Sequence, residues 1–232
     1  MIPLKNLSPR RSFPVVTLLL IAANVVVFLH QVTIPASQAD KFVKTFALVP
    51  LTVQYALAGT HHVTLAQALI PLFTCMFLHG GFLHIIGNMW FLWIFGGNVE
   101  DRMGSFFYLL FYLVCGIGSS MSQLLFSWGS PVPSLGASGA ISGVLGAYVI
   151  FFPASRILTL VPLFVFWFTA RIPAIVFIGL WFVVQILSGI GSLETVNTTG
   201  GVAWWAHIGG FLIGLLLAKG IRPQPTGNWD KI

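Results

Sequence analysis

Ser138 is the residue of this chain whose neighbours best suit a chemical role. It lies in Gly136-Ala137-Ser138-Gly139, after a proline-rich segment and directly before an apolar, helix-like run. Small neighbours let another backbone approach closely, as a reacting peptide must. The same pattern is also found as a tight turn leading into close-packed helices. A serine hydroxyl becomes a nucleophile only beside a base, so the interpretation depends on which residues reach Ser138.

The composition is that of a membrane protein. Of 232 residues, 57% are hydrophobic and 7% charged, whereas soluble domains carry roughly a quarter charged residues. The net charge of +6 follows membrane topology, so we expect no nucleic-acid partner. Cys75 and Cys115 lie far apart in apolar surroundings and are expected to be free packing residues. With no zinc-type cluster in the sequence, we expect neither a metal nor another cofactor.

Apolar segments predict an all-α polytopic membrane protein with one domain over residues 1–232. A helix needs about 20 apolar residues to cross a bilayer core. The predicted spans are residues 13–31, 78–97, 105–126, 138–152, 172–189 and 202–218. No small-residue cleavage site follows the first, so it is expected to be retained.

Two further segments are not predicted to span. Residues 32–77 are too long for an idle connection and are expected to form a structured element on the membrane surface. Residues 157–170 are apolar but too short to cross, and Pro162 interrupts them. We expect this second segment to be interfacial or re-entrant.

The basic residues predict the orientation. With a cytoplasmic N-terminus, nine of the 11 Lys and Arg residues lie inside and only Lys41 and Lys44 outside. This positive-inside pattern predicts a multi-pass protein of the cell membrane with both termini in the cytoplasm.

Three polar residues are predicted to share one depth. His84, Ser138 and His207 lie 15 to 18 residues before the arginine that follows their span. At about 1.5 Å per residue this places them roughly 22–27 Å above the cytoplasmic face. The hydrocarbon core is about 30 Å thick. Asn88, one turn after His84, projects from the same helix face. A single intramembrane histidine or asparagine can be only an interhelical hydrogen bond, but convergence from three helices favours a functional site.

Glycines supply the means of bringing these helices together. The fourth span has a small-residue stripe that starts at Gly139, and the sixth has one with Gly210 and Gly214. Such stripes let helices approach closely. Packing one against the other would place Ser138 within reach of His207.

The predicted chemistry is that of a serine–histidine dyad. No acidic residue is available at this depth, so His207 would act as base without an aspartate. Backbone N–H groups at Ser138 could hold a tetrahedral oxyanion where the helix begins. The side chains of His84 and Asn88 would add further donors.

Taken together, these motifs resemble the rhomboid family of intramembrane serine proteases, from the first span to Arg222. The resemblance is carried by His84-Ile85-Ile86-Gly87-Asn88, Gly96-Gly97-Asn98-Val99-Glu100-Asp101-Arg102-Met103-Gly104, Gly136-Ala137-Ser138-Gly139 and Ala206-His207-Ile208-Gly209-Gly210 with Gly214.

The resemblance implies a role for each matched residue. Ser138 would be the nucleophile and His207 the general base, with His84 and Asn88 as oxyanion donors. His79 would help to order the outer loop. Structural support is further expected from Gly136, Gly139, Gly210 and Gly214.

Two departures from the family pattern leave questions open. Several members have a Trp-Arg pair in the first outer loop, and residues 32–77 contain neither Trp nor Arg. Some members have a tyrosine four residues after the nucleophile, where this chain has Ser142. The first departure concerns anchoring of the loop, and the second concerns support of the His207 ring.

The sequence thus predicts an intramembrane serine endopeptidase that cleaves transmembrane segments near the outer leaflet. Water would reach Ser138 through an outward cavity under a mobile cap formed by residues 190–201. The resemblance implies that substrate passes the fifth span. A non-catalytic rhomboid-like chaperone that binds transmembrane clients is the alternative. A transporter fits poorly because no inverted repeat or buried acid is visible.

Overall fold

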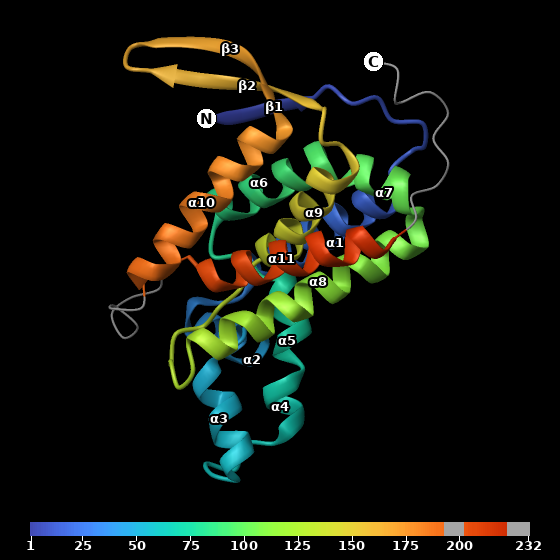
Figure 1. Cartoon of the computed structure of the whole chain (residues 1–232). Coiled ribbons are helices and arrows are strands. Elements are labelled where there is room, and N and C mark those ends of the chain that lie inside the picture. Colours follow the sequence, from blue (N-terminus) through green and yellow to red (C-terminus); the bar gives the residue numbers. More distant parts are fainter. Residues whose placement is uncertain (193–201, 222–232) are drawn as a thin grey trace.

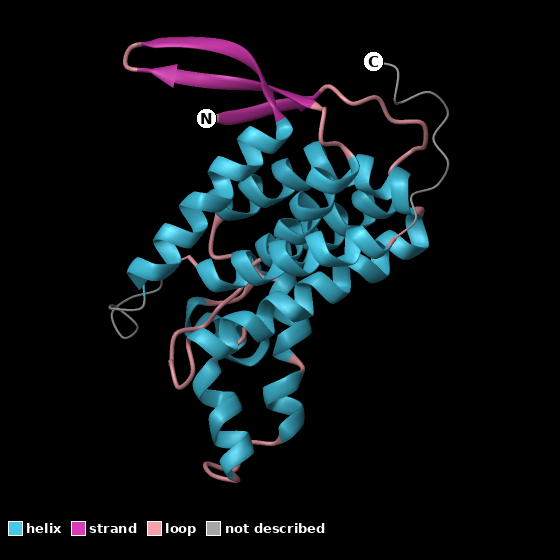
Figure 2. Cartoon of the chain, viewed as in Figure 1, coloured by secondary structure: helices cyan, strands magenta, loops and turns pink. Residues whose placement is uncertain are grey.

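The computed structural model describes residues 1–192 and 202–221, which form a helical bundle with one small sheet (Figures 1 and 2). The bundle helices are α1 (Val15–Thr33), α6 (Phe82–Phe91), α7 (Gly97–Met103), α8 (Ser105–Phe126), α9 (Ser138–Phe151), α10 (Ala174–Ser192) and α11 (Trp204–Gly220). A π-helical turn, η2 (Leu92–Gly96), joins α6 to α7. The mainly helical architecture predicted from the sequence is confirmed.

Helices occupy all six predicted spans. Among residues 1–192 and 202–221, four stretches are long and apolar enough to cross a membrane, namely α1, residues 82–103, α8 and α10. Helix α9 is shorter, with 14 residues. The crossing of the bilayer by six helices stays a prediction.

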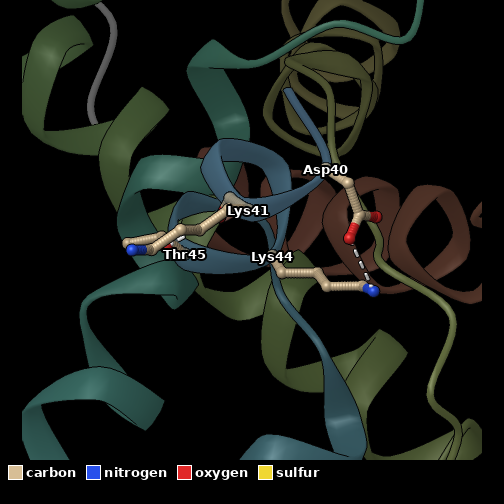
Figure 3. A network of polar contacts seen from close by, with 4 residues as sticks. All are labelled: Asp40, Lys41, Lys44 and Thr45. Carbon is tan, nitrogen blue, oxygen red and sulfur yellow. Dashed lines mark hydrogen bonds and ion pairs between the residues drawn. The ribbon is translucent and has the colours of Figure 1, made fainter. Parts of the chain in front are cut away.

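The segment after α1 is folded into short helices at the lower end of the molecule in Figure 1. These are α2 (Ala36–Phe46), α3 (Pro50–Ala58), α4 (Leu65–Leu69), α5 (Pro71–Thr74) and the 3₁₀ turn η1 (Cys75–Phe77). Thr64 and Gln67 form a capping box at the start of α4, which satisfies backbone donors there. On α2 the exposed Lys44 Nζ lies 2.8 Å from Asp40 (Figure 3). An exposed pair of this kind adds little stability.

The all-α prediction is wrong on the opposite side of the bundle, where the N-terminal residues and the segment between α9 and α10 form strands. Strands β1 (Ile2–Asn6), β2 (Arg156–Leu163) and β3 (Phe166–Pro173) form an antiparallel sheet in the order β1-β2-β3. The segment is rich in β-branched and aromatic residues, which favour strands. Pro162 is tolerated because β1 pairs with β2 only over residues 157–160, which leaves β2 an edge strand at Pro162. The pairing with β1 joins residues about 150 positions apart, which local patterns do not reveal.

Helix α9 is the centre of the bundle and packs most extensively against α11. The contact is made by backbones. A Cβ atom added to Gly210 would overlap the carbonyl oxygen of Gly139, and one added to Gly214 would overlap that of Gly143. The glycine stripes therefore set how closely these two helices approach.

The segment from Gly96 to Gly104 has a structural role, because it holds the start of α1. The buried Glu100 carboxylate accepts hydrogen bonds from the backbone N–H groups of Val16 and Thr17, at 2.9 and 2.8 Å. It also accepts from the hydroxyls of Thr17 and Ser105. A negative charge at a helix N-terminus is favourable, so Glu100 fixes the start of α1 to α7.

Candidate active site

Ser138 and His207 are in direct contact. The Ser138 Oγ lies 2.7 Å from Nε2 of His207. Ser138 is the first residue of α9, and His207 lies in the first turn of α11. Because both positions are at the ends of helices joined by the glycine contact, the packing of α9 on α11 brings the hydroxyl to the imidazole.

Gln185 of α10 completes a chain of hydrogen bonds. Its Oε1 lies 2.7 Å from Nδ1 of His207, and its Nε2 donates to the carbonyl oxygen of Trp181 at 3.2 Å. A carbonyl only accepts, so the amide nitrogen is held there and Oε1 must face the imidazole. Nδ1 of a neutral His207 then carries the proton. Nε2 is left as the acceptor for the Ser138 hydroxyl, which is the tautomer that a general base requires.

Gln185 is the site residue that sequence reasoning missed. It is 5% exposed within a mainly apolar helix. A signal existed, because a polar side chain in a membrane span is costly and is functional by default. The fifth span runs in the opposite predicted direction to the second, fourth and sixth, so the depth of Gln185 cannot be counted to a following arginine as theirs can.

The His207 ring has aromatic neighbours in place of the missing tyrosine. Its centroid lies 6.0 Å from the Trp181 ring at an interplanar angle of 33°, and 6.1 Å from Trp204 edge-on. Ser142, at the tyrosine position, donates to the carbonyl oxygen of Ser138 at 2.6 Å. The ring is thus supported from α10 and α11.

His84 and Asn88 point toward the same point near Gly136. The Gly80 N–H donates to Nδ1 of His84 at 3.2 Å, so neutral His84 carries its proton on Nε2. Nδ2 of Asn88 is buried and has no hydrogen-bond partner among the described residues. A Cβ on Gly136 would lie 2.8 Å from Nε2 of His84 and 3.6 Å from Nδ2 of Asn88. Glycine therefore leaves free the place where two donors converge.

The start of α9 adds backbone donors beside that place. Ala137 occupies the N-cap position and makes no side-chain capping hydrogen bond. The N–H groups of a first helical turn have no partner within the helix. The helix that begins at Ser138 therefore presents uncapped donors at the end where the hydroxyl lies.

His79 lies behind His84 and does not line the cavity. It is fully buried, and its ring meets that of His84 edge-on at 5.2 Å. The side chain of Gln31 holds its backbone, accepting from the His79 N–H at 3.2 Å and donating to its carbonyl at 2.7 Å. This pairing ties the segment before α6 to α1.

The loop before the nucleophile is anchored to the α2–α5 region. Leu48 and Ser134 exchange two backbone hydrogen bonds, of 3.0 and 2.7 Å, and the Gly136 N–H donates to the carbonyl of Cys75 at 2.9 Å. Thr74 also donates to the carbonyl of Phe46 at 2.7 Å. This region is thus anchored without a Trp-Arg pair.

A cavity of about 1010 Å³ opens beside Ser138 and His207. Its lining includes Ser138, His207, His84 and Asn88. The predicted cap, residues 190–201, falls mainly on positions 193–201, which lie outside the described residues. Within residues 1–192 and 202–221, no three His, Cys, Asp or Glu side chains are grouped to hold a metal ion.

The fold and site define a mainly helical membrane protein with a serine and a histidine in contact. The Rhomboid domain family model matches residues 66–224. RHOMBOID-like protein 6, mitochondrial, of Arabidopsis thaliana is 33% identical over 160 residues, 69% of this chain and 46% of that protein. RHOMBOID-like protein 1 of the same plant is 35% identical over 155 residues, 66% of this chain and 35% of that protein.

A bacterial relative is similar to the same extent. The rhomboid protease GluP of Bacillus subtilis (strain 168) is 33% identical over 161 residues, 69% of this chain and 27% of that protein. The chain belongs to the rhomboid family, as the sequence motifs predicted. It spans less than half the length of each of these three relatives.

Proposed function

We propose that this protein is an intramembrane serine endopeptidase that cleaves transmembrane segments of other membrane proteins. The observation that carries the proposal is the hydrogen bond between Ser138 Oγ and Nε2 of His207, with the tautomer set by Gln185. Membership of a family that includes a rhomboid protease agrees with it.

In the proposed reaction, Ser138 Oγ attacks the carbonyl carbon of the scissile peptide while its proton passes to Nε2 of His207. The oxyanion that forms accepts hydrogen bonds from His84, Asn88 and the backbone at Ser138. His207 then gives its proton to the leaving amine nitrogen as the C–N bond breaks. Water from the cavity attacks the acyl-enzyme, its proton passes through His207 to Ser138 Oγ, and the carboxylic product is released.

The geometry also limits the substrate. A helical peptide has its carbonyl groups hydrogen-bonded within the helix, so it must unwind before a carbonyl can reach the oxyanion donors. We therefore expect substrates with helix-weakening residues near the cleavage site. The resemblance to the rhomboid family further implies a small residue beside the scissile bond.

We further propose that the protein lies in the cell membrane with the sheet on the cytoplasmic side. Lys5, Arg156 and Arg171 all belong to the sheet, and basic residues favour the cytoplasmic side. The α2–α5 region, at the opposite end in Figure 1, would then face outward, and cleavage would occur near the outer leaflet. Protease accessibility of tags placed in the α3–α4 connection and before β1, in sealed vesicles, tests this orientation.

Purified full-length chain in lipid vesicles tests the catalytic proposal. Wild type should cleave a transmembrane substrate and react with a fluorophosphonate probe at Ser138, whereas Ser138→Ala and His207→Ala should abolish cleavage. The exposed residues Ser37 and His62 supply matched controls, and Ser37→Ala and His62→Ala should retain activity. Binding of transmembrane peptides without cleavage by wild type would instead indicate the chaperone function.

A further inference from the structure

The β2–β3 hairpin has one face without a charged side chain. In an antiparallel pair, directly opposite residues point to the same face, and the faces alternate along each strand. One face, here called the apolar face, consists of the pairs Ile157–Ile172, Thr159–Ala170, Val161–Phe168 and Leu163–Phe166. Along the whole hairpin this face is therefore suited to burial.

Protein covers only the first part of the apolar face. Ile157 and Thr159 are fully buried, and Ile157 belongs to the bundle core. Toward the tip, Leu163 is 52%, Phe166 73% and Phe168 48% exposed. The apolar face thus turns toward the bundle at its base and continues past the bundle edge uncovered by any described residue.

The opposite face carries the charge. Arg171 lies directly opposite Leu158, and Arg156, two residues before Leu158, shares that face. The remaining residues of this face include Leu160, Pro162 and Thr169, so its charge is confined to the base of the hairpin. Trp167 lies on the same face near the tip, and the rings of Trp residues favour the membrane–water interface. A face with basic residues at its base and a Trp near its tip, opposite a face without charge, is suited to the interface of a bilayer.

The surroundings of the hairpin indicate what covers its apolar face. In Figure 1 the hairpin leaves the bundle where α10 begins and points away from it. In the first turn of α10, Ile175 and Val176 are 51% and 46% exposed, as expected for a helix that faces lipid. The uncovered part of the apolar face therefore continues the lipid-facing surface of α10.

We propose that the β2–β3 hairpin lies in the bilayer leaflet on the side of the sheet, with Leu163, Phe166 and Phe168 among acyl chains. Arg156 and Arg171 lie at the level of the phosphates and favour anionic headgroups. Lipid is the occupant because the patch joins a lipid-facing helix and has basic residues behind it. This anchors the strand that leads into α10, and it does not depend on the catalytic proposal.

Adjacent residues on opposite faces allow a matched test. Phe168→Cys and Thr169→Cys are spin-labelled in the full chain, since the native Cys75 and Cys115 are buried. In phosphatidylcholine–phosphatidylglycerol vesicles, the label at position 168 should be severalfold more accessible to oxygen than to a water-soluble nickel chelate. The label at position 169 should show the reverse. Phe166→Cys and Trp167→Cys form a second such pair if the first does not fold.

Each alternative location of the hairpin predicts a different result in these measurements. Equal access of the nickel chelate to both labels would place the hairpin in water and overturn the proposal. Spin–spin broadening at position 168 that disappears on dilution with unlabelled protein would show that a second copy covers the face, which also overturns it. Omission of phosphatidylglycerol should raise nickel access at position 168, and no change would overturn the anionic-headgroup part.

Discussion

Gln185 Oε1 lies 2.7 Å from Nδ1 of His207, on the side of the ring opposite the Ser138 hydroxyl. This places an uncharged amide where the serine–histidine–aspartate arrangement has a carboxylate. The contact also joins α10 to the two helices that carry the proposed dyad. Any displacement of α10 that separates Gln185 from His207 would release the constraint on the tautomer.

Removal of the Gln185 amide is expected to lower kcat by about 10–100-fold, the range found when a group that orients a metal-binding histidine is lost. Gln185→Leu should leave KM for a transmembrane substrate nearly unchanged, because the amide touches His207, the proposed base, and does not line the cavity. Gln185→Glu, which retains an acceptor at Nδ1, should recover most of the activity. Steady-state kinetics in vesicles would measure both effects.

A structural role for Gln185 would give a different pattern. In ¹⁵N-histidine NMR spectra, wild type should show His207 with a protonated Nδ1, and Gln185→Leu should show a mixture of tautomers. Gln38→Leu on the exposed surface of α2 serves as control. An unchanged His207 spectrum in a folded Gln185→Leu protein would contradict the positioning role.

Loss of one oxyanion donor is expected to slow chemistry without removing the nucleophile. Asn88→Ala should lower kcat by about 10²–10³-fold, the range for one lost donor of this kind. Since Nδ2 of Asn88 has no partner in the described protein, its removal breaks no existing hydrogen bond and should leave thermal stability nearly unchanged. Cleavage rates and melting temperatures would be compared, and a loss of folding would argue for a structural Asn88.

The parts of the fold and the candidate site that could be predicted are those that show in the pattern of residues along the sequence. The helices came from local apolar runs, and Ser138, His84, Asn88 and His207 from polar residues at a common depth. The β1–β2 pairing joins segments distant in sequence, so no local pattern specifies it. Gln185 had a local signal as a polar residue in an apolar span, but it lies outside the spans whose depths could be compared. The sequence also left open what anchors residues 32–77, because the bonds involved are mostly backbone to backbone.

Glu100 offers a test of stability far from the proposed catalytic groups. Its two carboxylate oxygens accept from four donors on α1 and α8. In Glu100→Gln, an NH₂ group would meet two of these donors, so we expect a loss of about 1–3 kcal/mol. Wild-type and variant unfolding would be followed in detergent by far-UV circular dichroism. Unchanged stability would show that this network contributes little.

The glycine contact between α9 and α11 should be intolerant of one methyl group. In Gly214→Ala the added Cβ would overlap the carbonyl oxygen of Gly143, and overpacking of this kind costs about 1–3 kcal/mol. Buried Cys75 and Cys115 report unfolding through a thiol-reactive dye, and the melting temperature should fall. Gly179→Ala in α10, where a Cβ meets nothing within 4 Å, should keep or raise the melting temperature because alanine favours a helix.

Since the contact between α9 and α11 also holds Ser138 beside His207, Gly214→Ala should react more slowly with a fluorophosphonate below its melting temperature. Equal melting temperatures and equal labelling rates for Gly214→Ala and Gly179→Ala would mean that α9 and α11 can separate without a loss of stability.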